Sequence, residues 1–241
     1  MLGRPVRTHD RDLPGFRLRG SEVTRLEGFS DAVFGFALTL LVVSLDVPKT
    51  FDDLLDTMRG FPSFAVCFVF LAIIWNAHYK FCRRYALHDG TARFLTCLLL
   101  FLVLFYVYPL KFLFSLTVTN SIFGRSAHAV PMTVAQLSDL LTIYGLGFAA
   151  VYLAFVFLYL HAYRLRSELQ LTELERFDTR YQILRFVILV GMGLLAALIA
   201  RAPSVVRFSG LVYMLLFPIG RISRMIYFRR RAPYVAAIAG E

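Results

Sequence analysis

Long apolar runs recur along this chain and constrain its fold more than any other feature. A helix that crosses a bilayer needs about 20 mainly apolar residues. Six such runs are separated by charged or Pro/Gly-containing segments: 24–45, 61–82, 93–116, 138–162, 182–200 and 204–220. Hydrophobic residues make up 58% of the chain and charged residues 17%, which is too apolar for a soluble core of ordinary size. The sequence therefore predicts an all-α, polytopic membrane protein with six transmembrane helices.

The positive charges predict how these helices are oriented. Of the 26 Lys and Arg residues, 19 lie in the segment up to Arg25, in the connections 80–93 and 164–180, and after residue 220. Five lie in the alternate connections, and two lie within predicted helices. Because Lys and Arg are retained on the cytosolic side, this distribution predicts that both termini are cytosolic. The net charge of +10 thus reports topology, and no nucleic-acid motif accompanies it.

These boundaries divide the chain into three expected parts. Residues 1–23 form a cytosolic lead-in without the apolar core and cleavage site of a cleaved signal peptide. Residues 24–220 form the transmembrane domain, and residues 221–241 form a basic cytosolic tail. The arginines at 229–231 are expected to anchor the tail to anionic lipids of the inner leaflet. Membrane lipids are therefore expected partners, and nucleic acid is not.

Cysteine and glycine positions indicate packing rather than chemistry. Cys67, Cys82 and Cys97 are spaced fifteen positions apart, without the close pairs of a zinc or redox site. They are predicted to be buried structural thiols, and neither a cofactor nor a resident metal is expected. Small residues permit close approach of helices in lipid. They gather in two of the predicted helices, at Gly145, Gly147, Ala149, Ala150 and Ala154, and at Gly191, Gly193, Ala196 and Ala197.

The first predicted helix begins with charged residues, although a charge at the edge of a bilayer is costly unless it is paired. The residues form the pattern R-x-x-x-F-S-D, which comprises Arg25, Phe29, Ser30 and Asp31. Fourteen residues without an ionisable group follow, including Ala-Val-Phe at 32–34 and Thr-Leu-Leu-Val at 39–42. The second apolar run carries a Trp-x-x-His pattern, and the third ends in Tyr-Pro; these residues are Trp75, His78, Tyr108 and Pro109.

In these motifs, which cover roughly the first 110 residues, the chain resembles the transmembrane protein 175 family of potassium-permeable channels. The single six-helix unit is similar to the prokaryotic form, which implies the cell membrane of a prokaryote, or an endolysosomal membrane if the source is eukaryotic. The resemblance implies a homotetramer in which the first helix of each subunit lines the path of transient potassium ions. It also implies that the signature is a structural lock rather than a selectivity filter.

Helical phase agrees with this division of roles. Residues advance by about 100° each, so one stripe of the first helix carries Phe36, Thr39, Leu40 and Val43. Asp31 is roughly 140° from Phe36 and points away from the stripe. Trp75 and His78 lie at the same predicted depth as Ser30 and Asp31, so they can close a buried polar network. Alternatively, His78 is an interfacial histidine beside Tyr79 and Lys80, and Trp75 belongs to an aromatic belt.

The stripe also suggests how ions are controlled. The potassium filter motif T-V-G-Y-G is absent, and an apolar ring can close a pore by dewetting. Members of the family that this chain resembles usually have Ile or Leu at the position of Phe36. Phe36 is therefore the expected constriction, unless it packs between subunits. Thr39 either contributes a ring of oxygen ligands or bonds the carbonyl of Gly35 in its own helix. Asp46, Asp52, Asp53 and Asp56 form either an acidic outer vestibule or ordinary solvated loop charges.

Other functional classes fit the sequence less well. A secondary transporter needs a binding site in the middle of the membrane, and the last three predicted helices carry no ionisable group there. An enzyme is not expected, because Ser30 lacks a nucleophile-elbow setting and no metal-ligand pair occurs at helical spacing. A non-conducting membrane scaffold stays open as an alternative, because it would use the same packing features.

Overall fold

The computed structural model describes residues 13–20, 22–43, 49–115, 132–204 and 206–239. Within these ranges the regular structure is helical and contains no strand. The elements are α1 (Arg25–Val43), α2 (Phe51–Arg59), α3 (Phe61–Tyr85), α4 (Gly90–Phe114), α6 (Val134–Arg164), α7 (Glu173–Ala200), η2 (Val206–Leu215) and α8 (Leu216–Ala239). The all-α fold expected from the apolar runs is confirmed for this part of the chain.

Polar side chains define where several helices begin. Thr133 and Thr172 each accept a hydrogen bond from a backbone N–H three residues later, at the starts of α6 and α7. Asp89 caps α4 by accepting bonds from the backbone N–H groups of Thr91 and Ala92, and it lies 2.8 Å from His161 Nε2. Burial opposes ionisation of Asp89, but these hydrogen bonds outweigh it and lower its pKa. Asp89 and Thr172 thus set the starts of α4 and α7 at the bundle end that the charge pattern assigns to the cytosol, and Thr133 sets the start of α6 at the opposite end.

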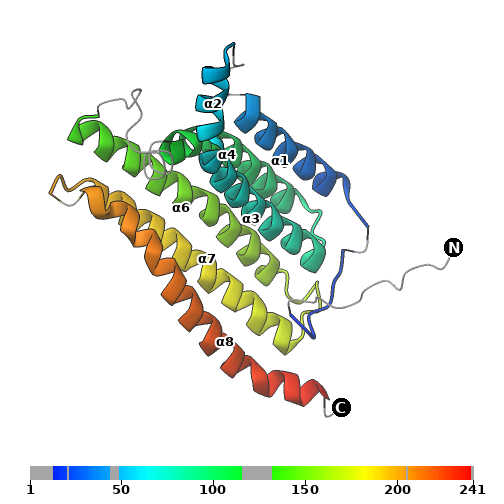
Figure 1. The fold of residues 1–241 in the computed structure, drawn as a ribbon. Helices are drawn as coiled ribbons and strands as arrows, with labels where there is room; N and C mark the ends of the chain where they lie inside the picture. Colours follow the sequence, from blue (N-terminus) through cyan, green and yellow to red (C-terminus); the bar gives the residue numbers. More distant parts are fainter. Residues whose placement is uncertain (1–12, 21, 44–48, 116–131, 205, 240–241) are drawn as a thin grey trace.

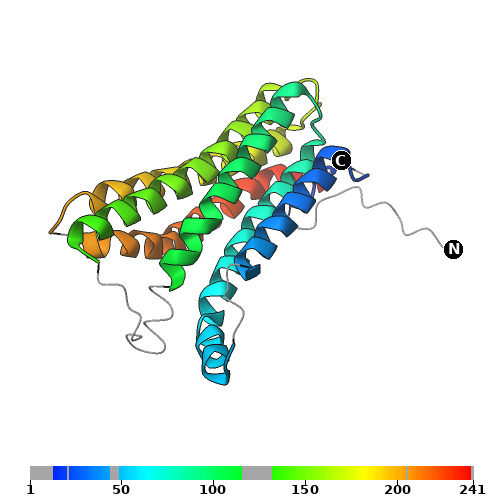
Figure 2. The ribbon, with the colours of Figure 1, turned by 90° about the horizontal axis from the view of Figure 1, so that it is seen from above.

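The helices pack in an order that follows the chain only partly. Helices α1, α3 and α4 contact one another, α4 contacts α6, and α6 packs along the length of α7. Helix α7 then packs on η2 and α8, which form the edge farthest from α1 in Figure 1; Figure 2 gives the same helices seen from above. The short helix α2 lies at the bundle end where α3 begins (Figure 1). Helix α1 is therefore covered on one side by α3 and α4, while its other side has no partner among the described residues of the subunit.

Five helical segments are long and apolar enough to cross a membrane: α3, α4, α6, α7 and Phe208–Val235. Helix α1 is not among them, so the expected number of six crossings is not established. Its 19 residues measure about 28 Å at 1.5 Å each, close to the hydrocarbon thickness, but its first two turns carry Arg25, Glu27 and Asp31. The chain is accordingly a multi-pass membrane protein with at least five candidate crossings in its described part.

Two helix boundaries differ from those expected. Helix α7 begins at Glu173 rather than at 182, because its polar first turns are stabilised by contacts with distant segments. The segment expected to cross at 204–220 consists of η2 and then α8, which continues to Ala239 through the basic residues of the expected tail. Hydropathy ends an apolar run at its first charged residues. The helix itself continues through them, because arginine is a good helix former.

The cysteines differ in exposure. Cys67 is buried and Cys82 is partly buried, but Cys97 is exposed. The expectation of three buried thiols is therefore wrong for Cys97, because this residue lies on a face of α4 that no other described helix covers within the subunit. All three are free thiols.

Candidate functional site

Helix α1 has two faces with opposite environments. Its buried face carries Glu27, Ser30, Phe34, Ala37 and Leu41, whose spacing of three and four residues follows one side of the helix. The large apolar members of this set belong to the main core. This face holds α1 in the subunit.

The predicted pore stripe lies on the opposite side of α1. The Phe36 side chain is 57% exposed, Thr39 is exposed and Leu40 is half-buried. Val43 ends the helix, and its side chain lies outside the described residues. At about 100° per residue, the centre of the stripe lies roughly 150° from the centre of the buried face. An apolar stripe is thus left without a partner in the described part of a single subunit.

Two backbone carbonyls of α1, one on the stripe and one on the buried face, accept hydrogen bonds from side chains. The Thr39 hydroxyl donates to the Phe36 carbonyl at 2.7 Å, one residue from the acceptor expected from the sequence. A hydroxyl oxygen that donates its proton still has lone pairs to accept a bond or coordinate a cation. Lys111 Nζ on α4 donates to the Leu41 carbonyl at 3.0 Å, so this ammonium group is tied to the last turn of α1.

The signature residues are brought together only in part. Trp75 Nε1 on α3 donates to Asp31 Oδ1 at 2.7 Å, a short hydrogen bond to a carboxylate. Ser30 is fully buried, but its hydroxyl donates to the Leu26 carbonyl of its own helix at 2.8 Å. Arg25 and Phe29 are exposed. One bond between helices therefore joins the signature to α3 within the described part of the subunit.

His78 makes a different contact from the one expected. It is buried, with its ring nitrogens 3.7 and 3.8 Å from Cys82 Sγ and its ring centroid 6.3 Å from that of Phe34. Among the described residues, no hydrogen bond joins it to Ser30 or Asp31. The expected closed network is thus reduced to the Trp75–Asp31 pair in the single subunit, and His78 packs beside it.

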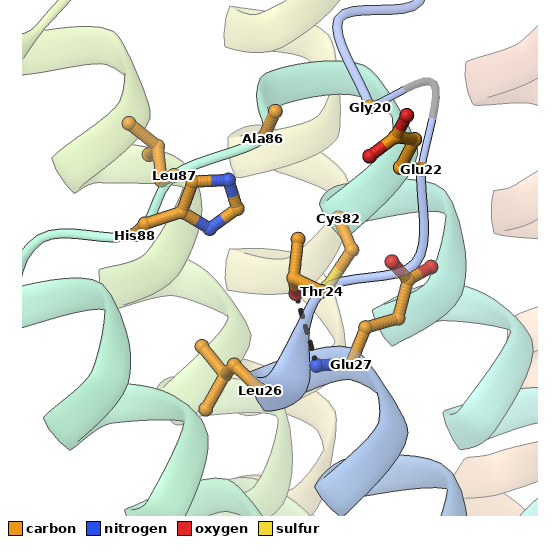
Figure 3. A pocket seen from close by; sticks show the side chains of 9 residues that line it. All are labelled: Gly20, Glu22, Thr24, Leu26, Glu27, Cys82, Ala86, Leu87 and His88. Atoms are coloured by element: carbon orange, nitrogen blue, oxygen red, sulfur yellow. Dashed lines mark hydrogen bonds between the residues drawn. The ribbon is translucent and has the colours of Figure 1, made fainter.

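A small pocket lies at the start of α1, between the lead-in and the end of α3 (Figure 3). Thr24 caps α1 by accepting a hydrogen bond from the Glu27 backbone N–H at 3.2 Å. The carboxyl groups of Glu22 and Glu27 and the imidazole of His88 lie around the pocket (Figure 3). The described residues contain no cluster of three metal-ligating side chains, so the pocket is not a metal site by that criterion.

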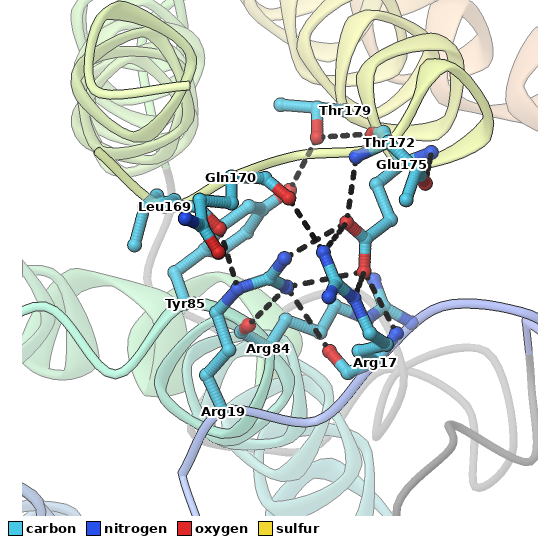
Figure 4. A network of polar contacts seen from close by, with 9 residues as sticks. All are labelled: Arg17, Arg19, Arg84, Tyr85, Leu169, Gln170, Thr172, Glu175 and Thr179. Carbon is cyan, nitrogen blue, oxygen red and sulfur yellow. Dashed lines mark hydrogen bonds and ion pairs between the residues drawn. The ribbon is translucent and has the colours of Figure 1, made fainter. Parts of the chain in front are cut away.

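A second polar network, which the sequence reasoning missed, connects the lead-in to α7 (Figure 4). Glu175 is fully buried and accepts hydrogen bonds from the Arg17 backbone N–H at 2.9 Å and from Arg19 Nη2 at 2.8 Å. The Arg19 guanidinium also donates to the carbonyls of Leu169 and Arg84, which belong to two other segments. The lead-in that precedes α1 is therefore anchored to the ends of α3 and α7.

Asp178, one turn further along α7, anchors the end of α8. It is fully buried and pairs with Arg231 through Nε at 2.9 Å and Nη2 at 3.0 Å, a two-bond contact. The Tyr227 hydroxyl donates to the same carboxylate at 2.6 Å. Arg231 also donates to the Pro14 carbonyl at 2.6 Å, so α8, α7 and the lead-in meet at one point. Arg231 is expected from the sequence to anchor lipid but has a protein partner.

One sequence signal could have revealed part of this network. Thr172 and Glu175 form a capping box at the start of α7, and this pattern is readable from the sequence. The partners of Glu175 could not be read in the same way, because Arg17 and Arg19 lie more than 150 residues away.

The acidic residues at the other end of α1 have local roles where they are described. Asp53 accepts hydrogen bonds from the backbone N–H groups of Thr50 and Lys49 and forms the capping box of α2. The Thr50 side chain and these backbone bonds lower the pKa of Asp53. Asp52 is exposed, the side chain of Asp56 is outside the described residues, and so is Asp46. The acidic vestibule thus stays a prediction.

Comparisons with known proteins agree with the signature. The sequence model of the family described as the endosomal/lysosomal potassium channel TMEM175 matches residues 25–106. A potassium channel of Marivirga tractuosa is 38% identical over 231 residues, covering 87% of this chain and 91% of that protein. A potassium channel of Chamaesiphon minutus is 32% identical over 97 residues, covering 37% of this chain and 48% of that protein.

A solved structure extends the likeness from the motif to the fold. The crystal structure of a variant of the potassium channel MtTMEM175, in complex with a nanobody–MBP fusion protein, aligns with a TM-score of 0.80 at 37% identity. The alignment covers 88% of this chain and 98% of that chain. With the signature on α1, the multi-pass helical fold and a relative matched over nearly its whole length, the chain belongs to the TMEM175 family of potassium channels and is not an enzyme.

Proposed function

We propose that four copies of this chain form a potassium-permeable channel in which the exposed stripe of each α1 lines the pore. The observation that carries the proposal is the environment of α1: its buried face is packed, whereas the Phe36 and Thr39 side chains are exposed on the opposite face. Four such helices around an axis would enclose the stripe. We take potassium as the permeant ion because the relatives are named potassium channels.

Phe36 forms the constriction in this arrangement. Its ring is exposed on the stripe and is bulkier than a branched aliphatic side chain, so four rings would make a narrow apolar ring that closes by dewetting. The negative faces of the rings can also attract a cation, by about 0.5–1 kcal/mol each at exposed sites. The gate is therefore tight when the rings meet but not repulsive to cations when they separate.

Thr39 lies one turn beyond Phe36 and supplies the oxygen atoms of the pore. Its hydroxyl proton is donated to the Phe36 carbonyl, which leaves the oxygen lone pairs free to face an ion. Four such oxygens can replace part of the hydration shell of potassium.

The Asp31–Trp75 hydrogen bond serves as a lock that fixes the rotation of α1 against α3. A rotation of α1 that moves the Phe36 ring off the axis would also break this bond, which is only 2.7 Å long. Hydrogen bonds at one bundle end join the lead-in, the start of α4 and the ends of α3, α6 and α8. This arrangement supports a topology with both termini in the cytosol. The organisms of the relatives favour the plasma membrane of a prokaryote.

Recording from purified protein in planar bilayers tests the function. We expect discrete single-channel steps carried by potassium, with a flux above that of a carrier. Phe36→Ala should raise the basal flux several-fold, because the apolar ring is lost. Phe101→Ala is the matched control, since Phe101 is also exposed but lies on α4. Equal flux in the two variants would remove Phe36 as the constriction, and an absence of any steps would favour a scaffold.

Thr39→Val tests the oxygen ring separately. The substitution keeps the shape of the side chain and removes the hydroxyl, so we expect the reversal potential in mixed potassium and sodium solutions to move toward the sodium equilibrium potential. An unchanged reversal potential with normal conductance would show that Thr39 serves only its own helix through the Phe36 carbonyl.

A further inference from the structure

Helices α7 and α8 enclose a groove that the channel function does not use. It has a volume of about 540 Å³, within the ~300–1,000 Å³ typical of small-molecule sites. The groove lies at the edge of the bundle farthest from α1 (Figure 1). Its walls come from the segments 177–188 and 219–230, which run antiparallel. Both helices that line the groove belong to candidate membrane crossings, which makes a membrane lipid the natural candidate for its occupant.

The chemistry of the groove changes along its length in one direction. Two arginines, Arg180 and Arg230, lie at the end near the start of α7. The hydroxyls of Tyr181 and Ser223, 3.5 Å apart, follow. The other end is lined by aliphatic side chains that include Ile188 and Ile219. This order of charge, hydroxyl and hydrocarbon matches the order of phosphate, glycerol ester and acyl chain in a phospholipid.

The length of the groove matches one leaflet of a bilayer. From Arg230 to Ile219 on α8 the helix rises about 16 Å, and from Arg180 to Ile188 on α7 it rises about 12 Å. Half of the hydrocarbon core is about 15 Å. A single lipid of the leaflet that the arginines face would therefore fill the groove from headgroup to chain end.

The two arginines have donors to spare. Arg230 is exposed and takes part in no hydrogen bond or ion pair with any described residue. Arg180 donates through Nε to the Tyr163 hydroxyl at 2.7 Å, which holds its guanidinium over the Tyr163 ring at 5.2 Å. Its terminal nitrogens make no bond within the described chain. Arg231, in contrast, is already neutralised by Asp178, so it does not compete for an anion.

We propose that the groove between α7 and α8 binds one anionic phospholipid, with its phosphate held by Arg180 and Arg230 and an acyl chain along the isoleucines. Guanidinium groups bind phosphate through paired hydrogen bonds. A zwitterionic lipid offers the same phosphate together with a cationic group that the arginines repel. The site therefore selects anionic headgroups such as phosphatidylglycerol over phosphatidylcholine.

Lipid retention measures this selectivity without requiring ion conduction. The full-length protein is reconstituted in vesicles of equimolar phosphatidylglycerol and phosphatidylcholine, extracted in mild detergent, and analysed by native mass spectrometry for bound lipid. We expect phosphatidylglycerol to be enriched on the protein. Each basic residue near an anionic surface contributes about 1 kcal/mol, so Arg230→Gln should lower retained phosphatidylglycerol about five-fold.

Arg229→Gln is the matched control for charge, because Arg229 is exposed on the same helix but does not line the groove. Ile226→Trp fills the groove and should lower retention of both lipids. Equal retention of phosphatidylglycerol in Arg230→Gln and Arg229→Gln, or no enrichment in the unaltered protein, would overturn the proposal. Size-exclusion profiles identify any variant that fails to fold. If Arg230→Gln fails to fold, Arg230→Lys is tested in its place, and a smaller loss of retained phosphatidylglycerol is expected because Lys keeps the charge but cannot form paired hydrogen bonds. Retention equal to that of the unaltered protein in Arg230→Lys would also count against the paired-bond site.

Discussion

Gly193 on α7 provides the most quantitative test of how this bundle is packed. A Cβ atom added at this position would lie 2.8 Å from the carbonyl oxygen of Gly145, and 3.0 and 3.1 Å from the backbone nitrogen and Cβ of Ala149 on α6. Ordinary van der Waals contact begins at 3.4 Å. Two of the three neighbours are backbone atoms, which cannot rotate away. The substitution Gly193→Ala must therefore push α6 and α7 apart locally.

The cost can be isolated with a control on the same helix. Overpacking a tight contact costs about 1–3 kcal/mol, while replacing Gly by Ala inside a helix gains about 1 kcal/mol. A Cβ atom added at Gly191, two residues earlier, would have no described atom within 4 Å, so Gly191→Ala obtains the gain without the clash. The helix-propensity contribution is the same in both variants. Their difference in unfolding free energy thus equals the clash alone, about 1–3 kcal/mol.

Thermal unfolding in detergent, followed by tryptophan fluorescence and size exclusion, measures this difference. For soluble domains of this size each kcal/mol shifts Tm by about 2–4 °C, so Gly193→Ala should melt clearly below Gly191→Ala. Equal melting temperatures would refute the close approach of α6 and α7 at this point. A lower Tm for Gly191→Ala would instead mean that its face packs against another subunit.

Two further perturbations address the polar contacts. Trp75→Phe removes the hydrogen bond to Asp31 but keeps the aromatic ring, and we expect a loss of about 1 kcal/mol in stability together with altered open probability in single-channel records. Asp178→Asn leaves the buried Arg231 guanidinium without its counter-charge, and removing one partner of a buried pair costs about 3–5 kcal/mol. The loss should appear as a lower Tm, with greater proteolytic sensitivity of α8.

The outcomes that would contradict these two expectations are distinct. Unchanged gating in Trp75→Phe would show that the bond to Asp31 does not set the rotation of α1. If Asp178→Asn melts like the unaltered protein, the Arg231 contact is not desolvated in the membrane. The double variant Asp178→Asn with Arg231→Met serves as the control, because it removes both charges and should recover part of the lost stability.

The positions of the helices were largely predictable from the sequence because hydrophobic length is a local property. The apolar runs identified α1, α3, α4 and α6 to within a few residues. The helical phase of α1 placed Phe36 and Thr39 on one stripe, and this stripe is exposed. Both inferences depend on helical geometry and composition, which need no knowledge of partners.

The glycines show where such reasoning stops. Four were expected to form packing faces, and their neighbours differ completely. Gly145 and Gly193 face each other, Gly147 faces the ring of Tyr106 on α4, and Gly191 faces no described atom within 4 Å. Their spacing in the sequence is the same in α6 and in α7, so periodicity alone could not separate them.

The sequence by itself determined that this chain enters a membrane, where most of its long helices lie and which family signature opens α1. Only the tertiary structure decided that Glu175 holds Arg17 and Arg19, that Asp178 holds Arg231, and that α7 and α8 leave a groove between them. The physical reason is that lipid and helix surfaces are equally apolar, so hydrophobicity does not specify which helices meet. Close backbone contacts and buried charge pairs make that choice, and they join residues far apart in the chain.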